Sequence, residues 1–558
     1  MPTAEATLTN YRFIPLTEAK AREWVAALPI ADTGETTKRI FHGLVDLNRR
    51  ALPPQTRLAI SELLRPAVDI ALENLHRHLV ARAFPLTQKS QKILELTQSV
   101  MLEFAGSYQV ATLDMITRNE SAKKLLQLAI YRVLDYMGRV LLLTYSVYVR
   151  TRETLWHDVH HLYLLAVENG VDQLRLKDGY SIGAPTIEAR YVQINLLALA
   201  KPYCLRQGEV NRLMQYFANN THLVSIAREA NEIVGEYVHA AMLNSDEPAV
   251  MMLASDVPHS PTVRVLNLNA LVTLMDRHIR KLEESGVPAM LLHDGLSRNL
   301  AKRVIYHLTA VRHRSFNRFP KKEEKIGMVS RMTDVLTVIK ESHKSDDGVA
   351  TQEEDALFNV FLARDDDEHD DNQRRKAIEQ VDDQPGARVQ AWKVLNSSVG
   401  GYGLCWEGKE ESGARVGEIV GLRDLSNENA AWMIGVIKWM EFVQKRGLCC
   451  GVELLSTKTM VVNVKQALNR AIRQKLPCEG LMLPSIEGSR PDPALVLPAY
   501  IFQTGDEICL ELAEREERVR LLILDECLGA FAYFRFTNLA EKIVEEDDDD
   551  FNSLWQSL

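Results

Sequence analysis

Hydrophobic residues recur every three or four positions through the first half of the chain, which is the pattern of amphipathic and buried helices. From about residue 17 to residue 241 one such segment follows another, with few alternating β-branched runs between them. Gly170 and the pair Asn219–Asn220 stand where helices are expected to stop. The pattern predicts an all-α bundle or an irregular helical stack, with no repeat of fixed period. The expected helices span residues 56–82, 91–116, 122–149, 152–169, 186–205 and 208–217.

A polar, proline-containing stretch follows this helical region. Residues 245–261 contain three prolines and two Ser-Asp pairs, which favours a linker. Renewed helical spacing predicts one helix over 263–284 and another across 295–311.

After residue 312 the pattern changes to short runs rich in Val, Ile and Trp, separated by Gly, Asn and Asp. Such runs are typical of an antiparallel barrel or sandwich. An acidic interruption over 342–384, including the run 365–371, predicts a mobile loop insertion with one short helix at 353–363. The expected strands span residues 389–395, 416–422, 432–442 and 450–455.

A second β-rich segment follows a helix that we expect over 462–475. The chain then ends in an acidic tail, EEDDDD at 545–550, which is typical of a solvated segment. The strands expected in this second segment span residues 494–503, 507–512, 519–525 and 530–536.

Composition narrows the class of protein. Hydrophobic residues make up 46% of the 558 residues and charged residues 25%, which excludes wholesale disorder. A net charge of −9 argues against a general binder of nucleic-acid polymers.

The most apolar stretch, 125–149, carries Arg132, Asp135 and Arg139 at near-helical spacing, so we expect a buried bundle helix rather than a membrane span. The N-terminus lacks the features of a secretory signal, and seven scattered cysteines without a CxxC pair favour a reducing cytoplasm.

Two short motifs carry candidate chemistry. The first is Arg314-Ser-Phe-Asn-Arg318, which leads into the first β segment. Two arginines four residues apart can project planar, permanently charged groups toward one ligand. Such groups pair with phosphate, contact the O6 and N7 edge of guanine, or stack on a base.

The second motif is Asn396-Ser-Ser398-Val-Gly400-Gly401, which follows the strand expected at 389–395. Asn396 and Ser398 offer short donors and acceptors for the edge of a base. Gly400 and Gly401 permit a sharp turn and a close approach of the backbone to a ligand. An ordinary hairpin turn would use the same residue types, and Arg314 and Arg318 would also fit a solvated basic face.

An RxxxR sequence followed by an NxSxxG sequence resembles the paired motifs of the PilZ family, whose members are receptors for cyclic di-GMP. The later segments at 416–424, 432–439 and 451–456 also resemble strands of that family. The acidic insertion accounts for a longer gap between the motifs than the family usually has. The resemblance implies a six-stranded barrel. It also implies that the ligand-binding residues are Arg314, Arg318, Asn396, Ser398, Gly400 and Gly401, with Arg312 available for a second ligand molecule.

We therefore expect an α+β multidomain protein with an all-α N-terminal domain, a PilZ-like antiparallel β-barrel and a second, smaller barrel-like unit. The 461–540 unit resembles the degenerate barrels that accompany PilZ domains. The expected boundaries are 1–245 for the helical domain, 246–311 for the linker and connecting helices, 312–460 for the PilZ-like barrel with its insertion at 342–384, 461–540 for the helix and second barrel, and 541–558 for the acidic tail.

A cluster of histidines is the main alternative site. Spacings of three and four residues place His157, His160 and His161, with Glu153, on one expected helix, which could hold a metal. A second ligand-bearing helix is not evident, so we expect structural or surface histidines and no metal. The acidic run 365–371 lacks the glycine and glutamate of a calcium-binding loop.

The sequence shows none of the catalytic signatures that we sought, such as a P-loop, GxSxG or HExxH. We expect a cytoplasmic receptor, without enzymatic activity or cofactor, that binds cyclic di-GMP and acts on protein partners through its helical domain. Motility, pilus and biofilm control are the usual targets of the family. The alternative is a ligand-independent interaction scaffold with a degenerate barrel. Whether one or two ligand molecules bind stays open.

Overall fold

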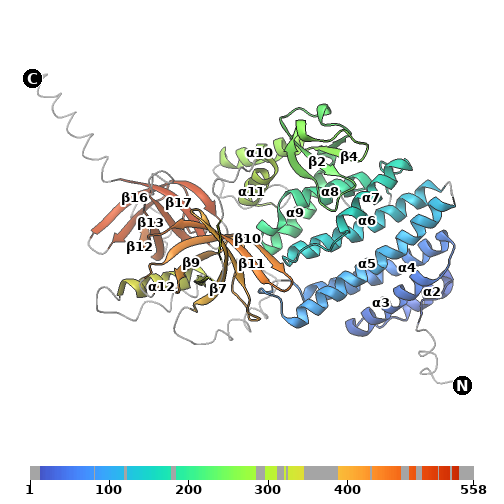
Figure 1. Cartoon of the computed structure of the whole chain (residues 1–558), viewed down its shortest axis with the longest axis horizontal. Helices are drawn as coiled ribbons and strands as arrows, with labels where there is room; N and C mark the ends of the chain where they lie inside the picture. The colour runs from blue at the N-terminus through green and yellow to red at the C-terminus, as the bar shows by residue number, and fades with distance from the viewer. Residues whose placement is uncertain are drawn as a thin grey trace, which may run out of the picture. The chain divides into compact units, whose positions relative to one another are not determined.

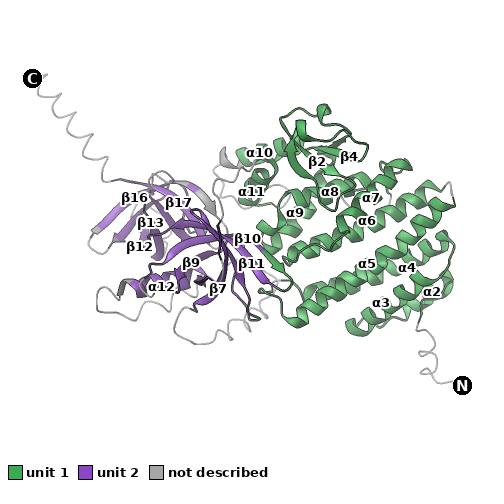
Figure 2. Ribbon diagram, in the orientation of Figure 1, with its two compact units in different colours: residues 1–314, 409–411, 441–445 green, residues 315–408, 412–440, 446–558 purple. Residues whose placement is uncertain are grey.

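The computed structural model (Figure 1) forms two compact units (Figure 2). Unit 1 comprises residues 1–314, 409–411 and 441–445, and unit 2 comprises residues 315–408, 412–440 and 446–558. The structure describes residues 13–539, except 81, 119–121, 177–183, 285–295, 311–318, 322–323, 345–387, 428–429, 467–476, 485–492, 500, 513–514 and 528–530.

Helices make up most of unit 1, as the periodicity predicts (Figure 1). Their ends follow local chemistry. The side chain of Asp32 accepts a hydrogen bond from the backbone N–H of Glu35 at 2.9 Å, and Gly170 follows the last turn of one helix with a φ of +64°. The helices are α2 (Glu18–Ala26), α3 (Thr33–Arg49), α4 (Pro54–Arg77), α5 (Gln88–Thr117), α6 (Lys123–Ser146), α7 (Leu155–Glu168), α8 (Ile187–Leu199) and α9 (Gln207–Asn220).

Helix α6 corresponds to the apolar stretch at 125–149 and is buried on most of its surface. Its expected role as a bundle helix is confirmed. Among the helices that the structure describes, none combines the length and the apolarity needed to cross a membrane.

The charges on α6 belong to a buried ionic network with α4 and α8. Arg132 donates to both carboxylate oxygens of Glu62, at 2.9 and 3.1 Å, and the hydroxyl of Tyr108 donates to Glu62 at 2.7 Å. Arg190 lies 3.0 Å from Asp135. Burial alone would raise the pKa of each carboxyl group, but the neighbouring guanidinium groups outweigh it and hold both pKa values below their usual range. The network therefore compensates the charges that the helices bury.

Removal of one carboxylate from this network should destabilise unit 1. Glu62→Gln removes the charged group that accepts two hydrogen bonds from the almost fully buried Arg132, and we expect a loss of about 3 kcal/mol in the free energy of unfolding. Because the pKa of Glu62 is depressed, its stabilisation is present at neutral pH and is lost as the pH falls through its folded-state pKa. The variant should therefore lose stability less steeply in acid. Urea unfolding followed by helical circular dichroism measures both effects.

A matched control lies on the same helix. Glu73 pairs with Arg77 at 3.4 Å, and both side chains are about 70% exposed. Glu73→Gln should change the free energy of unfolding by less than about 0.5 kcal/mol. Equal effects of the two substitutions would contradict the assigned importance of the buried network.

Unit 1 also contains a small antiparallel sheet that the periodicity did not predict. Its strands are β1 (Ser225–Ala227), β2 (Tyr237–Met242), β3 (Val250–Leu253) and β4 (Val263–Asn267), in the order β1-β4-β2-β3. The expectation of helix up to residue 241 and of a linker over 245–261 is therefore wrong at these positions. The inner strands β2 and β4 are buried on both faces, so they lack the alternation that identifies a strand. The helix expected over 263–284 begins only at α10 (Asn269–Glu284), and α11 (Arg298–Thr309) follows it.

The first barrel of unit 2 is closed by six antiparallel strands in the order β7-β6-β9-β10-β11-β8, and β8 pairs back to β7. Trp392, Val394 and Leu404 are fully buried. The four expected strands are present within a few residues, but β6 and β8 were missed. The strands are β5 (Phe319–Pro320), β6 (Lys325–Ser330), β7 (Gln390–Ser398), β8 (Gly401–Trp406), β9 (Ile419–Asp424), β10 (Met433–Val443) and β11 (Gly447–Ser456).

A helix that the sequence analysis did not predict, α12 (Met332–Lys344), follows β6. It includes the first residues of the insertion expected over 342–384. Residues 345–387, with the short helix expected at 353–363, lie outside the described residues.

The second barrel of unit 2 is also closed, in the order β12-β13-β14-β17-β16-β15. The helix expected over 462–475 is wrong in its described part, which forms β12. There Val462 and Val464 are buried and Asn463 and Lys465 are exposed, which is the alternation of a strand. The strands are β12 (Met460–Gln466), β13 (Cys478–Leu483), β14 (Ala494–Pro498), β15 (Glu507–Leu512), β16 (Arg515–Cys527) and β17 (Phe531–Asn538).

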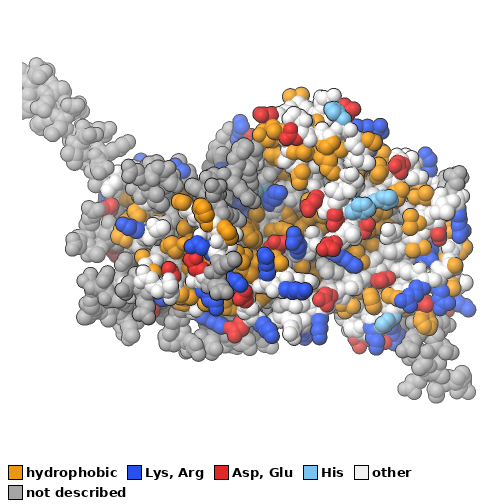
Figure 3. All heavy atoms as spheres, viewed as in Figure 1, with side chains coloured by type: hydrophobic (Ala, Val, Ile, Leu, Met, Phe, Trp, Pro, Cys, Tyr) orange, Lys and Arg blue, Asp and Glu red, His pale blue; other side chains and the backbone are white. Residues whose placement is uncertain are grey.

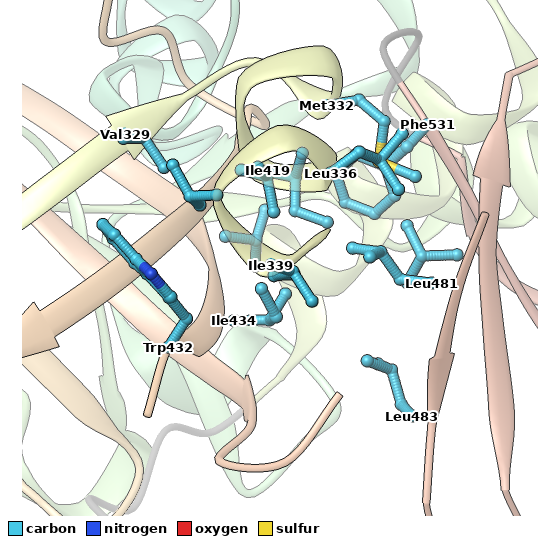
Figure 4. Close-up of a cluster of buried hydrophobic side chains, with 14 of the residues drawn as sticks. Val329, Met332, Leu336, Ile339, Ile419, Trp432, Ile434, Leu481, Leu483 and Phe531 are labelled. Atoms are coloured by element: carbon cyan, nitrogen blue, oxygen red, sulfur yellow. The ribbon is translucent and has the colours of Figure 1, made fainter. Parts of the chain in front are cut away.

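One hydrophobic core joins the two barrels through α12 (Figure 4). Leu336 and Ile339 of α12 meet Ile434 of the first barrel and Leu481 and Phe531 of the second. Because the core draws on both barrels, it stabilises unit 2 as a whole.

The contribution of α12 can be measured with neighbouring substitutions. Leu336→Ala removes a side chain that is 2% exposed, so it should lower the free energy of unfolding of unit 2 by about 3 kcal/mol. Thr337→Ala, on the exposed side of the helix, should change it by less than about 0.5 kcal/mol. Urea unfolding followed by tryptophan fluorescence measures the difference, and equal values would contradict the core assignment.

Candidate ligand-binding site

The NxSxxG sequence forms the β7–β8 hairpin. Asn396 and Ser398 end β7, residues 399 and 400 form a two-residue turn, and Gly401 begins β8 as the partner of Ser398. The hydroxyl of Ser398 donates to the carbonyl oxygen of Gly401 at 3.4 Å. The carbonyl oxygen of Gly400 accepts from the backbone N–H of Leu454 at 3.0 Å, which ties the turn to the neighbouring strand β11.

Strand β5, which directly follows the RxxxR motif in the sequence, pairs with this hairpin. Phe319 is the Cα partner of Ser397, and Pro320 is the partner of Asn396. The backbone N–H of Lys321 then donates to the carbonyl oxygen of Leu395 at 3.2 Å. Phe319 directly follows Arg318 in the sequence, so the chain that leaves the RxxxR motif pairs with the NxSxxG motif. Arg312, Arg314 and Arg318 themselves lie outside the described residues.

A β-bulge determines which way Asn396 points. The β7–β8 register shifts by one residue between Val394, which pairs with buried Leu404, and Asn396, which pairs with Gly403. Since Leu404 faces the barrel interior, the alternation of a strand puts Gly403 on the outer face. The amide of Asn396 lies over Gly403, where an added Cβ would meet its Oδ1 at 2.8 Å. Asn396 is therefore held on the outer surface of the barrel.

Gly401 has a structural role that the sequence does not reveal. A Cβ at this position would collide with the carbonyl oxygen of Val452 and lie 3.1 Å from its carbonyl carbon. We expected this glycine to allow close approach of a ligand, whereas in the structure it allows close approach of the β11 backbone. Gly400 is a partly buried residue of the hairpin turn.

Side chains outside the two motifs also surround the hairpin. Tyr402 is half-buried, and burial, followed by the nearby charge of Glu324, raises the pKa of its hydroxyl. Lys321 forms an ion pair with Glu324 at 3.0 Å and is partly exposed. Phe319 is 64% exposed and Val399 is 84% exposed. These residues could not be found from sequence motifs, because they belong to neither motif and only strand pairing places them near the hairpin.

The histidine cluster on α7 has a structural explanation. His160 is fully buried, and its two ring nitrogens bond the hydroxyl of Tyr191 and the carbonyl oxygen of Glu247, both at 2.8 Å. Burial lowers the pKa of His160, which favours its neutral form. His157 and His161 stack with ring centroids 6.3 Å apart. Within the described ranges no group of three His, Cys, Asp or Glu side chains is arranged to hold a metal ion.

A closed six-stranded barrel with the NxSxxG sequence at its β7–β8 turn, and the RxxxR sequence before the strand that pairs there, defines a PilZ-type domain. Family models of the cyclic-di-GMP receptor FimW match three consecutive parts of the chain: the N-terminal domain at 19–230, the middle PilZ domain at 238–460 and the C-terminal β-barrel domain at 466–539. The chain belongs to this family of PilZ-domain cyclic-di-GMP receptors.

A curated relative agrees with the family models. The cyclic-di-GMP receptor FimW of Pseudomonas aeruginosa is 25% identical to the chain, and the match covers 99% of this chain and 98% of the relative. No solved structure matches the chain significantly. The middle-domain model begins at residue 238, so it includes β2 to α11 as well as the first barrel.

The contact between Gly401 and β11 can be tested by substitution. Gly401→Ala should destabilise unit 2 by about 3 kcal/mol or more, because both strands are in register and neither backbone can move alone. Gly505 also has a positive φ, +93°, but an added Cβ there would meet nothing within 4 Å. Gly505→Ala should therefore cost only about 1 kcal/mol. Urea unfolding of both variants would contradict the assignment if the two losses were equal.

Proposed function

We propose that this protein is a receptor for cyclic di-GMP that binds its ligand at the outer surface of the first barrel. The observation that carries the proposal is the strand register, in which Phe319 pairs with Ser397 and Pro320 with Asn396. The two residues that directly follow the RxxxR sequence therefore pair with the NxSxxG hairpin, which supports a site that combines the two motifs. The names of the matching family models and of the curated relative support the same ligand.

The chemistry of the two motifs matches the ligand, which carries two phosphates and two guanines. Arg314 and Arg318 supply permanent charges for phosphate and planar donors for the O6 and N7 edge of guanine. Asn396 and Ser398 supply hydrogen bonds to a base from the hairpin, and Gly400 keeps the turn that follows them compact. Gly401 sets the position of the hairpin against β11. Arg312 is available for a second ligand molecule.

The site offers recognition without a reactive centre, so we propose a binding protein rather than an enzyme, acting in the cytoplasm without membrane insertion. A nucleic-acid polymer is a poor alternative ligand, because the net charge is −9. On the face shown in Figure 3, acidic and basic side chains are intermingled over the described part of each unit rather than gathered by sign.

Signal transmission follows from the place of the arginine motif in the chain. The sequence passes from unit 1 to unit 2 between Arg314 and Ser315, inside that motif. A ligand held by both arginines can therefore favour one arrangement of the helical region over another, and so change the surface that a protein partner meets. The shift is limited by the difference in the ligand's affinity for the two arrangements. Motility, pilus or biofilm machinery are the partners that we propose.

Calorimetric titration of the full chain tests the proposal. We expect cyclic di-GMP to bind with micromolar or tighter affinity, and GMP and cyclic di-AMP to bind more weakly. Arg314→Ala and Arg318→Ala should each weaken binding by at least about tenfold, because each removes a charge-assisted contact. Asn396→Ala should weaken it by about fivefold.

Matched controls lie on the second barrel. Arg520→Ala on β16 and Asn463→Ala on β12 change exposed residues of the same types, and both should leave the affinity unchanged. Absence of binding in the parent protein, or undiminished binding in both arginine variants, would overturn the proposal in favour of a ligand-independent scaffold.

A further inference from the structure

Two thiols meet between β8 and β11 of the first barrel. Cys405 and Cys449 are Cα partners in this antiparallel pairing, and their Sγ atoms lie 3.1 Å apart. The Cys405 thiol also donates to the carbonyl oxygen of Arg446 at 3.3 Å. Both cysteines are buried, at 1% and 4% exposure. The proposed ligand chemistry uses neither thiol.

The hydrogen-bond pattern of the two strands favours a covalent link at this position. Antiparallel strands alternate between hydrogen-bonded and non-hydrogen-bonded pairs, and Leu454 donates to Gly400 at 3.0 Å. Counted from that bond, Cys405 and Cys449 form a non-hydrogen-bonded pair, whose Cα atoms lie about 4.5 Å apart. Disulfides span Cα separations of about 4.4 to 6.8 Å, so the paired strands can accept one as they stand.

Glycines fix the register of the two strands on either side of the thiols. Gly401 lies against the backbone of Val452 near one end of the pairing. Gly447 begins β11 at the other end with a φ of +109°, and an added Cβ there would collide with the carbonyl oxygen of Trp406. The strands therefore approach closely at both ends, which keeps the two sulfur atoms opposite each other.

A third thiol beside the pair points the other way. Cys450 is fully buried and pairs with Leu404, which faces the barrel interior. Strand alternation therefore places Cys405 and Cys449 together on the outer face and Cys450 on the inner face. The hydrogen bond from Cys449, followed by burial, raises the pKa of the Cys405 thiol. Because the thiolate is the reactive form, the pair stays reduced until an oxidant is present.

We infer that Cys405 and Cys449 form a reversible disulfide when a peroxide reaches the protein, which makes the β8–β11 pair an oxidative modification site. One thiol, as its thiolate, attacks a peroxide oxygen and becomes a sulfenic acid, and the first water leaves. The second thiol then attacks the sulfenic sulfur, the S–S bond forms and the second water leaves. The two thiols lose two electrons and two protons, and the peroxide is reduced to two waters.

The disulfide would tie together two strands that hold the candidate hairpin. It joins residues 44 positions apart, so it restricts the unfolded chain more than the folded barrel. Oxidised unit 2 should therefore resist unfolding. The inference does not depend on the proposed ligand.

Peptide mapping of the full chain by mass spectrometry under non-reducing conditions tests the inference. Hydrogen peroxide is raised until Cys204 and Cys509, which are less buried, are oxidised. Peptides containing Cys405 and Cys449 should then appear as one linked species, two hydrogens lighter than their sum, and dithiothreitol should separate them. The parent protein suffices for this measurement, so the test does not depend on the folding of a variant.

Variants of neighbouring cysteines supply the controls. Cys449→Ala should abolish the linked species, and Cys450→Ala should retain it. Urea unfolding followed by tryptophan fluorescence should shift to higher urea after peroxide treatment of the parent and of Cys450→Ala, but not of Cys449→Ala. The inference is overturned if Cys405 and Cys449 remain unlinked under these conditions, or if Cys449 links to Cys450 instead.

Discussion

The backbone hydrogen bonds along β7 are the interaction on which the candidate site depends. Strand β7 pairs with β6 near its start, with β8 toward its end and with β5 at its last residues. The β7–β8 pairing closes the barrel, and the β5 pairing holds Phe319 and Pro320 against the hairpin. Closure leaves β7 without an open edge, so its register cannot slip without disrupting the whole barrel.

Small residues then give the outer face its shape. Gly401 lets β8 approach β11 closely, and the bulge between Val394 and Asn396 turns the asparagine outward. Gly403 leaves room for the amide of Asn396, and Gly451 on β11 leaves room for the indole of Trp439.

The rest of unit 2 holds this surface rigid. Helix α12 fills the space between the barrels with Leu336 and Ile339, so the second barrel supports the first from the side that the helix covers. In unit 1, the pairing of Glu62 with Arg132 lets helices with internal charges pack together without isolated buried ions.

Local pattern was sufficient for the long helices, for most strands of the first barrel and for the two motifs, because helical and strand periodicities and turn chemistry act over a few residues. It failed where burial on both faces removed alternation, as in β4, and where a valine-rich strand resembled a helix, as in β12. The NxSxxG order at 396–401 was recognisable as a motif of the family from the sequence alone. The pairing of this motif with the chain that follows Arg318, and the contact of Gly401 with β11, depend on strands distant in sequence. Such pairing is a property of the closed barrel, since its register is set by the packing of every strand together.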